Sequence, residues 1–265
     1  MRVISAGAPV SPRILERFAR CLPAGARIHT PYGATESLPI ASIDNVEVLG
    51  ETRAATATGR GICVGRPVPS IRVDVIRIDD APIASWSDGL RVPDGDVGEI
   101  TVLGPQVTTH YFDAREETAR HKITAADGRG VHHRTGDVGY LDASGRLWYC
   151  GRKAHRVETE AGPRFSEMVE GPFNTHPDVK RTALVPVPRA RDQEPVLCVE
   201  LEPGADVEDE RRVVEELRAI GACHDVTRDV ERFLVHREPF PVDIRHNAKI
   251  GREKLAVWAR SQIGR

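Results

Sequence analysis

The sequence predicts an α/β part followed by a small α+β lobe, and three observations support this fold class. Near the N-terminus a helical pattern lies between two strand-like runs. From about 60 to 150, short strand-like runs alternate with turn signals, which predicts a small β-rich subdomain. Beyond it, helical and strand-like segments alternate. We therefore expect a first domain at 1–150, a hinge at 151–154 and a small lobe at 155–265.

The first elements follow from local signals. Residues 2–6 have the apolar character of a short buried strand. Ser11 and Pro12 then predict the start of a helix that runs to about Cys21, because Ser is a favoured N-cap and Pro suits the first helical position. A second strand is expected at 27–30. This strand-helix-strand order is typical of the edge of an α/β sheet.

The later elements rest on short runs with the right period. Within the β-rich subdomain, strands are expected at 73–78, 98–103 and 147–150. In the small lobe, helices are expected at 165–174 and 209–220, and strands at 182–187 and 196–201. The chain begins directly on an apolar strand, so we expect a piece of a longer protein that exposes a large apolar surface.

Composition excludes several classes of function. The net charge of −2 gives no basic field for nucleic acid, and an aromatic content of 5% argues against single-strand binding grooves. The apolar runs are too short for a membrane span. The five cysteines are widely spaced and form no C-x-x-C pair, which predicts reduced thiols and a cytoplasmic location.

The most informative segment is the pentapeptide 32–36, Tyr-Gly-Ala-Thr-Glu. Its residue types suit a nucleotide. The Tyr32 ring can stack on a base, Gly33 lets the backbone come close, Thr35 can bond a phosphate, and Glu36 can hold Mg²⁺. The alternative interpretation is a polar turn that follows a strand.

Three downstream positions could complete such a site. Asp137 follows a Gly and precedes an apolar run, where a carboxylate can accept both hydroxyls of a ribose, although a turn Asp can also bond its own backbone. Arg152 lies in a cationic run that could bind ribose or phosphate, form a hinge, or remain a solvated loop. Lys249 is expected on a short loop before a terminal helix, where it could stabilise charge developing on a phosphate.

In order and rough spacing, these four elements resemble the adenylate-forming superfamily, which includes acyl-CoA synthetases, peptide-synthetase adenylation domains and luciferases. Further family-like segments are 5–10, 61–69, 98–100, 104–106 and Tyr111. The resemblance covers essentially the whole chain, but the family's phosphate loop does not occur in it. The chain thus resembles the C-terminal half of these enzymes, which implies the end of the large AMP-binding lobe followed by a small mobile lid domain.

The resemblance also implies roles for single residues. Tyr32 would stack on adenine, Thr35 would bond the α-phosphate, and Glu36 would hold Mg²⁺. Lys249 would bridge the substrate carboxylate and the phosphate during adenylation. The implied cofactors are ATP and Mg²⁺, and the implied nucleotide-binding residues are Gly7, Ala8, Pro9, Tyr32, Gly33, Asp137 and Arg152.

Segments 30–43, 173–177 and 247–250 resemble one branch in particular, the β-lactone synthetases of bacterial long-chain olefin biosynthesis. The branch implies adenylation of a long-chain 2-alkyl-3-hydroxy fatty acid, followed by displacement of AMP by its own hydroxyl. It also implies other enzymes of the olefin pathway as partners. The loop 161–170 departs from the CoA-ligase pattern at Ser166, and Ala154 replaces the usual hinge Asp or Lys, so use of CoA is in doubt. Two alternatives stay open, an acyl-CoA synthetase or fatty-acyl-AMP ligase and an inactive nucleotide-binding fragment.

Overall fold

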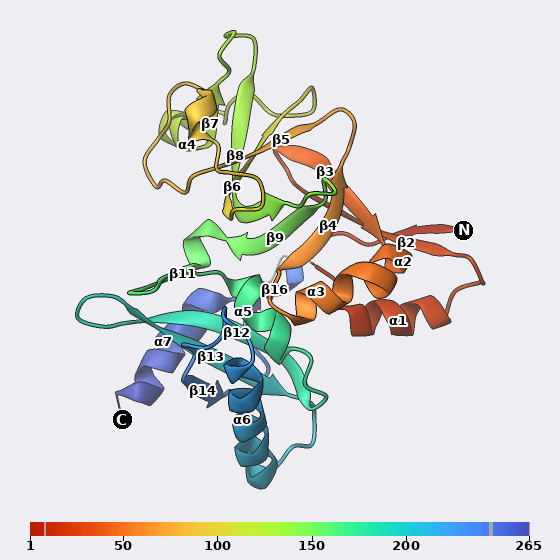
Figure 1. Cartoon of the computed structure of the whole chain (residues 1–265), viewed down its shortest axis with the longest axis vertical. Helices are drawn as coiled ribbons and strands as arrows, with labels where there is room; N and C mark the ends of the chain where they lie inside the picture. The colour runs from red at the N-terminus through yellow and green to blue at the C-terminus, as the bar shows by residue number, and fades with distance from the viewer. Residues whose placement is uncertain (8, 244–245, 265) are drawn as a thin grey trace. The chain divides into compact units, whose positions relative to one another are not determined.

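The computed structural model describes residues 1–7, 9–243 and 246–264, so the predicted site residue Ala8 lies outside the described residues. The chain forms two compact units (Figure 1). Unit 1 comprises Met1–Arg53 and Ile62–Lys153, and unit 2 comprises Ala54–Gly61 and Ala154–Arg265.

Unit 1 is built on a sheet of nine strands with the order β1-β2-β3-β4-β9-β8-β6-β5, and β7 pairs with β8. The strands β1 and β2 are parallel, and the other pairs are antiparallel. The bounds are β1 (Arg2–Ile4), β2 (Arg27–Ala34), β3 (Ser37–Asp44), β4 (Ile62–Pro67), β5 (Arg72–Ile76), β6 (Gly98–Leu103), β7 (Lys122–Thr124), β8 (Val131–Leu141) and β9 (Leu147–Arg152). The predicted sheet edge and the predicted β-rich segment are therefore parts of one continuous sheet.

The junction between these parts is the pairing of β3 with β4, where Ala41 faces Pro67 and Ser42 faces Arg66. Gly65 makes this approach possible. It has a φ of +88°, and a Cβ there would lie 2.0 Å from the carbonyl oxygen of Ser42.

The first helix of unit 1 begins where the sequence indicates. In α1 (Pro12–Arg20), the side chain of Ser11 accepts a hydrogen bond from the Ile14 amide at 3.3 Å, and Leu15 is buried. This confirms the predicted N-cap. The remaining helical segments up to the unit boundary are α2 (Asn45–Glu47), the π-helical turn Val48–Thr52, α3 (Arg53–Ala57), α4 (Arg115–His121) and the 3₁₀ turns Asp88–Leu90 and Lys153–His155.

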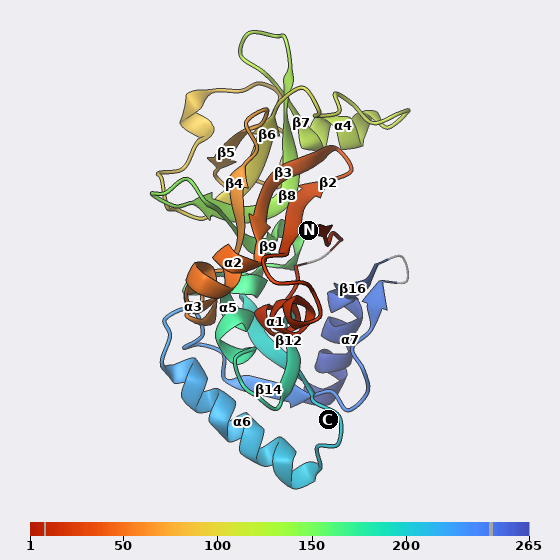
Figure 2. The ribbon, with the colours of Figure 1, turned by 90° about the vertical axis from the view of Figure 1, so that its right-hand side faces the viewer.

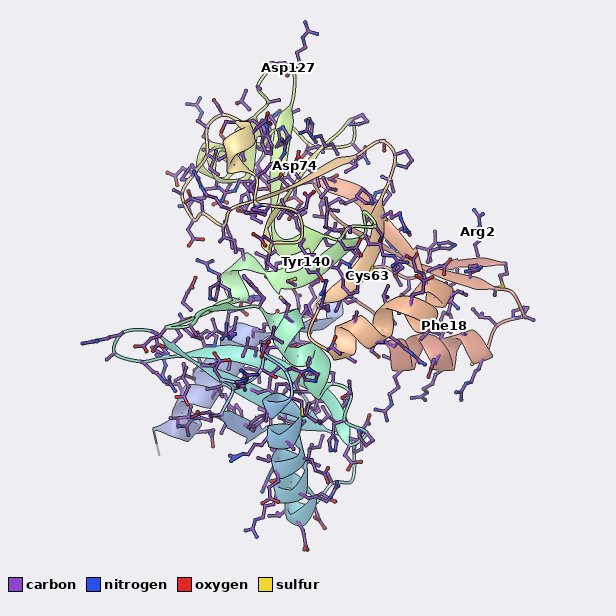
Figure 3. All side chains as sticks on the ribbon, in the orientation of Figure 1. Arg2, Phe18, Cys63, Asp74, Asp127 and Tyr140 are labelled. Atoms are coloured by element: carbon purple, nitrogen blue, oxygen red, sulfur yellow. The ribbon has the colours of Figure 1, made fainter. Side chains whose placement is uncertain are left out.

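The side chains of the central strands of unit 1 form a hydrophobic core cluster. It consists mainly of aliphatic side chains from β3, β4, β6 and β9, namely Ile40, Ala41, Val64, Ile71, Ile100, Val102, Val107 and Leu147. Cys63 and Tyr140 are also buried in unit 1, whereas Asp127 lies in the loop that joins β7 and β8 (Figure 3).

Unit 2 contains a three-stranded sheet with helices on both faces (Figure 2). The sheet has the order β12-β13-β14, and alternate residues of its strands face opposite sides. Leu184 and Leu197 pack with α5 and α6, whereas Val185 and Cys198 pack with α7. The bounds are β12 (Val179–Pro188), β13 (Gln193–Leu201), β14 (Arg232–Val235), α5 (Ser166–Phe173), α6 (Val207–Ala222) and α7 (Arg252–Ile263).

Two small hairpins complete unit 2, β10 (Val157–Thr159) with β11 (Gly162–Arg164), and β15 (Val242–Asp243) with β16 (His246–Ile250). The segment 54–61 joins this unit because it packs on α5. A Cβ on Gly171 would lie 2.3 Å from the Thr56 carbonyl oxygen. No helix within the described ranges is long and apolar enough to span a membrane.

Candidate active site

The pentapeptide 32–36 forms the end of a strand and the tip of a hairpin. The strand β2 does not end near residue 30, as the sequence suggests, but continues to Ala34, and only Thr35 and Glu36 form the turn into β3. Gly33 lies where the register shifts, and a Cβ there would lie 2.6 Å from the Ser37 carbonyl oxygen. A bulge of this kind redirects the side chains that flank it.

Tyr32 and Asp137 are in direct contact. The Tyr32 hydroxyl donates a hydrogen bond to Asp137 Oδ2 at 2.6 Å. The rings of Tyr32 and Tyr149 lie 5.9 Å apart at 42°. Burial and the Asp137 carboxylate raise the pKa of the Tyr32 phenol well above its ordinary value, so it stays a proton donor at neutral pH.

The carboxylate of Asp137 also faces Arg152 across the sheet. The two residues are register partners in β8 and β9, and Arg152 Nε lies 3.2 Å from Asp137 Oδ1. Gly136 has a φ of +71° within β8, and the Asp137 amide donates to Thr135 Oγ1 at 3.1 Å. This local twist fixes Asp137, whose side chain is 12% exposed beside an Arg152 side chain that is 44% exposed. The Asp137 charge in turn raises the pKa of Arg152, so the guanidinium stays charged.

A second cluster surrounds Glu36. Its Oε1 accepts a hydrogen bond from the Tyr111 hydroxyl at 2.7 Å, and its backbone carbonyl accepts one from the Thr108 amide at 2.9 Å. Burial opposes ionisation of Glu36, but the Tyr111 hydrogen bond and the nearby His133 and Lys122 hold its pKa below the usual value. Glu36 is therefore an oriented carboxylate at neutral pH.

Lys122 adds a buried cation to this cluster. Its Nζ donates to the Thr108 carbonyl at 2.5 Å and to Thr108 Oγ1 at 3.0 Å, and it lies 5.4 Å from the centre of the Tyr111 ring. Burial lowers its pKa to about 8, against the attraction of Glu36. Nothing in the sequence pattern around Lys122 indicates a site residue, and Tyr111 was noted only as part of a family-like segment, with no role of its own.

The remaining predicted positions of unit 1 are accessible. Thr35 is exposed at the hairpin tip. Gly7 and Pro9 are exposed after β1, and the loop is joined to β2 by a hydrogen bond from the Ser5 amide to the His29 carbonyl at 2.9 Å. Gly7 has a φ of +112°, which favours glycine.

Lys249 belongs to unit 2 and is exposed. The sequence placed it on a short loop, but it lies in the strand β16, which pairs with β15. The predicted terminal helix is confirmed as α7, which begins at Arg252. Thus Tyr32, Asp137 and Arg152 form one contact group of unit 1, and Glu36 belongs to a second group of the same unit. Lys249 belongs to unit 2.

These groups fit an adenosine nucleotide with its divalent cation. The carboxylate in the middle of β8 can accept hydrogen bonds from vicinal hydroxyls, and the guanidinium beside it at the end of β9 can donate to them. Oε1 of Glu36 is held by Tyr111 while the carboxylate keeps further lone pairs, and Mg²⁺ is often bound by one carboxylate together with phosphate oxygens. Within the described ranges, no group of three or more His, Cys, Asp or Glu side chains could hold a metal by itself.

Comparison with known proteins agrees with this chemistry. Residues 1–112 match the family described as AMP-binding enzyme. The chain is 55% identical to the olefin beta-lactone synthetase of Xanthomonas campestris pv. campestris, over 97% of this chain and 47% of that protein. It is 54% identical to the olefin beta-lactone synthetase of Stenotrophomonas maltophilia, over 99% and 47%.

The fold agrees as well. The amide bond synthetase McbA from Marinactinospora thermotolerans matches with a TM-score of 0.75 and 28% identity, over 97% of this chain and 47% of that structure. The chain spans about half the length of the curated relatives it matches. The resemblance to the C-terminal half of adenylate-forming enzymes, and the fold class that it implies, are thereby confirmed.

Proposed function

We propose that this chain, which resembles the C-terminal half of adenylate-forming enzymes, forms part of an AMP-forming ligase that adenylates a carboxylic acid with ATP. The observation that carries the proposal is the contact group of Tyr32, Asp137 and Arg152, because it offers a ring, an oriented carboxylate and a guanidinium in one place. Those are the groups that an adenosine requires.

In this proposal Asp137 and Arg152 bind the ribose hydroxyls, and the ring of Tyr32 stacks on adenine. The segment Gly7, Ala8 and Pro9 lies along the other side of the base, and Gly33 lets the backbone come close to the nucleotide. The hydroxyl of Thr35 donates to the α-phosphate, which its exposure at the hairpin tip allows.

Glu36 would hold Mg²⁺, and the bound ion would neutralise charge on the phosphates of ATP. The support is that Tyr111 and Lys122 keep the Glu36 carboxylate ionised and oriented. Lys249 would stabilise the two anions that meet when the substrate carboxylate attacks the α-phosphorus. In that step a carboxylate–phosphorus bond forms, and the bond to the leaving pyrophosphate breaks.

We further propose a long-chain 2-alkyl-3-hydroxy fatty acid as the substrate. After adenylation, its hydroxyl oxygen bonds to the acyl carbon, the bond from that carbon to AMP breaks, and the hydroxyl proton leaves to water. The product is a β-lactone. The names of the two curated relatives at 54% and 55% identity support this chemistry. Because the nucleophile is internal, no thiol acceptor such as CoA is needed.

The arrangement of the chain suits such an enzyme. We propose that 155–265 is a mobile lid domain behind a hinge at 151–154, which agrees with the unit boundary between Lys153 and Ala154. The structure joins the five cysteines in no disulfide, namely Cys21, Cys63, Cys150, Cys198 and Cys223, which supports a cytoplasmic location. Other enzymes of the olefin pathway would be partners there.

The test is Lys249→Ala in the complete enzyme. Pyrophosphate exchange should fall about 10²- to 10³-fold, because one preorganised donor is lost, while ATP binding persists. Exchange at the wild-type rate would reject the assignment of Lys249. Incubation with ATP and a 3-hydroxy acid, with and without CoA, then identifies the product, and CoA-dependent thioester formation would reject the lactone chemistry.

A further inference from the structure

The strand that carries Lys249 pairs with one short strand, and only its last residue, Ile250, is known to pack against a core cluster of unit 2 within the described ranges. It belongs to a two-stranded sheet in which β15 has two residues and β16 has five. A two-stranded hairpin of this size is marginally stable in water. The position of Lys249 must therefore depend on how the residues at the ends of the hairpin are held.

One end of the hairpin is anchored just after Lys249, at Arg252. This arginine is the first residue of α7 and is 8% exposed. Its Nη2 donates to Glu170 Oε2 at 3.0 Å, and its Nη1 donates to Glu170 Oε1. The same Nη1 also donates to the Leu184 carbonyl, which lies 3.3 Å away. Oε1 of Glu170 also accepts the Leu184 amide at 2.7 Å.

These hydrogen bonds connect three elements of unit 2, namely α5, β12 and α7. Glu170 belongs to α5 and is 2% exposed, and Leu184 belongs to β12, an edge strand of the three-stranded sheet. Glu167 lies one helical turn earlier, 3.6 Å from Arg252 Nη2. The planar guanidinium matches the carboxylate with two parallel hydrogen bonds, which fixes orientation as well as distance.

A backbone contact holds the same end of the hairpin. The Gly251 amide donates to the Pro241 carbonyl at 2.7 Å, and a Cβ on Gly251 would lie 3.3 Å from that oxygen. Pro241 directly precedes β15, and Gly251 directly follows β16. The base of the hairpin is thus closed beside the Arg252–Glu170 pair, and Lys249 is two residues before Gly251 and three before Arg252.

We propose that Arg252 is a positioning residue that acts through Glu170 to set where Lys249 is presented. The catalytic part of this inference rests on the proposed role of Lys249, but the structural part does not. A buried ion pair adds little net stability over an apolar pair of equal volume, and its best-attested value is to specify one arrangement. A bidentate pair that joins α7 to α5 at the base of a weak hairpin can specify one arrangement in this way.

The first experiment measures amide hydrogen exchange in the 265-residue chain, for Arg252→Lys, Arg252→Met and the control Arg164→Met. Arg164 also pairs with a carboxylate of the same unit, that of Asp229, with Nε 2.9 Å from both oxygens, but this pair is more exposed and is not at the hairpin. We expect exchange at the described residues 242–243 and 246–251 to rise at least about 10-fold in both Arg252 variants relative to α6, and to stay unchanged in the control. Equal protection of this hairpin in all three variants would overturn the proposal.

The second experiment separates positioning from catalysis in the complete enzyme. Arg252→Lys keeps a positive charge but loses the bidentate geometry, so adenylation should fall roughly 10- to 100-fold in kcat with the KM for ATP unchanged. An unchanged kcat, with Lys249→Ala inactive, would overturn the positioning role. If Lys249→Ala is itself active, the proposed function of Lys249 fails, and hydrogen exchange still decides whether Arg252 holds the hairpin.

Discussion

The hydroxyl of Tyr32 donates to Oδ2 of Asp137 at 2.6 Å across 105 residues of sequence. The contact joins the end of β2 to the middle of β8 within one sheet. Arg152 faces the other carboxylate oxygen, so Asp137 is fixed from two sides. A carboxylate held in this way needs little reorganisation to bind a ligand.

The first prediction concerns this hydrogen bond. Tyr32→Phe should lower the free energy of unfolding by about 1–3 kcal/mol, because a buried carboxylate loses a donor while the ring remains. In a double-mutant cycle with Asp137→Asn, the coupling energy should be about 1–2 kcal/mol. Urea unfolding of the four proteins provides the measurement. Strictly additive effects would show that the contact does not contribute to stability.

The second prediction concerns ribose recognition. If Asp137 binds the ribose hydroxyls, the complete enzyme should bind ATP at least about 10-fold more tightly than 2′,3′-dideoxy-ATP. In Asp137→Asn that preference should largely disappear, because the amide presents one acceptor where the carboxylate presents two. Titration of both nucleotides against both proteins measures the difference. A preference that survives the substitution would place the ribose elsewhere.

Local signals in the sequence were sufficient for some of the elements, whereas others, such as β8 and α4, were not predicted. The Ser11 cap of α1 and the strand at 98–103 were predicted with close to their observed bounds, because capping and apolar periodicity are properties of neighbouring residues. The candidate site was predicted as four separate segments. Its internal contacts were not predicted, because they join segments far apart in the chain, such as Glu36 with Tyr111.

Two further differences between the expected and the observed elements also arise from contacts that the local sequence does not show. A polar turn was the alternative interpretation of the whole segment 32–36, and the strand before it was expected to end near residue 30. The bulge at Gly33 and the continuation of β2 depend on pairing with β3. Lys249 was expected on a loop because β15 and β16 are too short to give a periodic signal. The extent of a short strand is determined by the strand that it pairs with, and the local sequence pattern does not contain this information.

The third prediction concerns the junction of the sheet at Gly65. Gly65→Ala should lower the free energy of unfolding by at least about 3 kcal/mol, because a Cβ would meet the Ser42 carbonyl at 2.0 Å and the φ of +88° is unfavourable for alanine.

The matched control is Gly95→Ala. Gly95 also has a φ of +88°, but no atom lies within 4 Å of its added Cβ. Its substitution should cost only about 1–2 kcal/mol, the backbone contribution alone. Thermal or urea unfolding of both variants gives the difference. Equal losses would mean that the approach of β3 to β4 does not require glycine.

The fourth prediction concerns stability in acid. His132 is buried, stacks on Trp86 with ring centres 3.8 Å apart, and has Nδ1 3.7 Å from Asp74 Oδ2. Burial, followed by the Arg72 charge, lowers the pKa of His132 from 6.5 to about 4. Asp74, labelled in Figure 3, also pairs with Arg91, and burial raises the pKa of its carboxyl.

The direction in which stability changes with pH follows from which state of the protein binds the proton. Between pH 6.5 and pH 4 the unfolded chain protonates His132 while the folded chain does not, so this contribution to stability is lost as the pH falls through that window. From pH 7.5 to pH 5 the loss should be about 2 kcal/mol. His132→Phe keeps an aromatic ring against Trp86 and removes the titration. Urea unfolding at both pH values should therefore show a smaller acid loss in the variant by about that amount. Identical acid losses in the two proteins would mean that His132 is already protonated in the folded state, or is accessible to solvent.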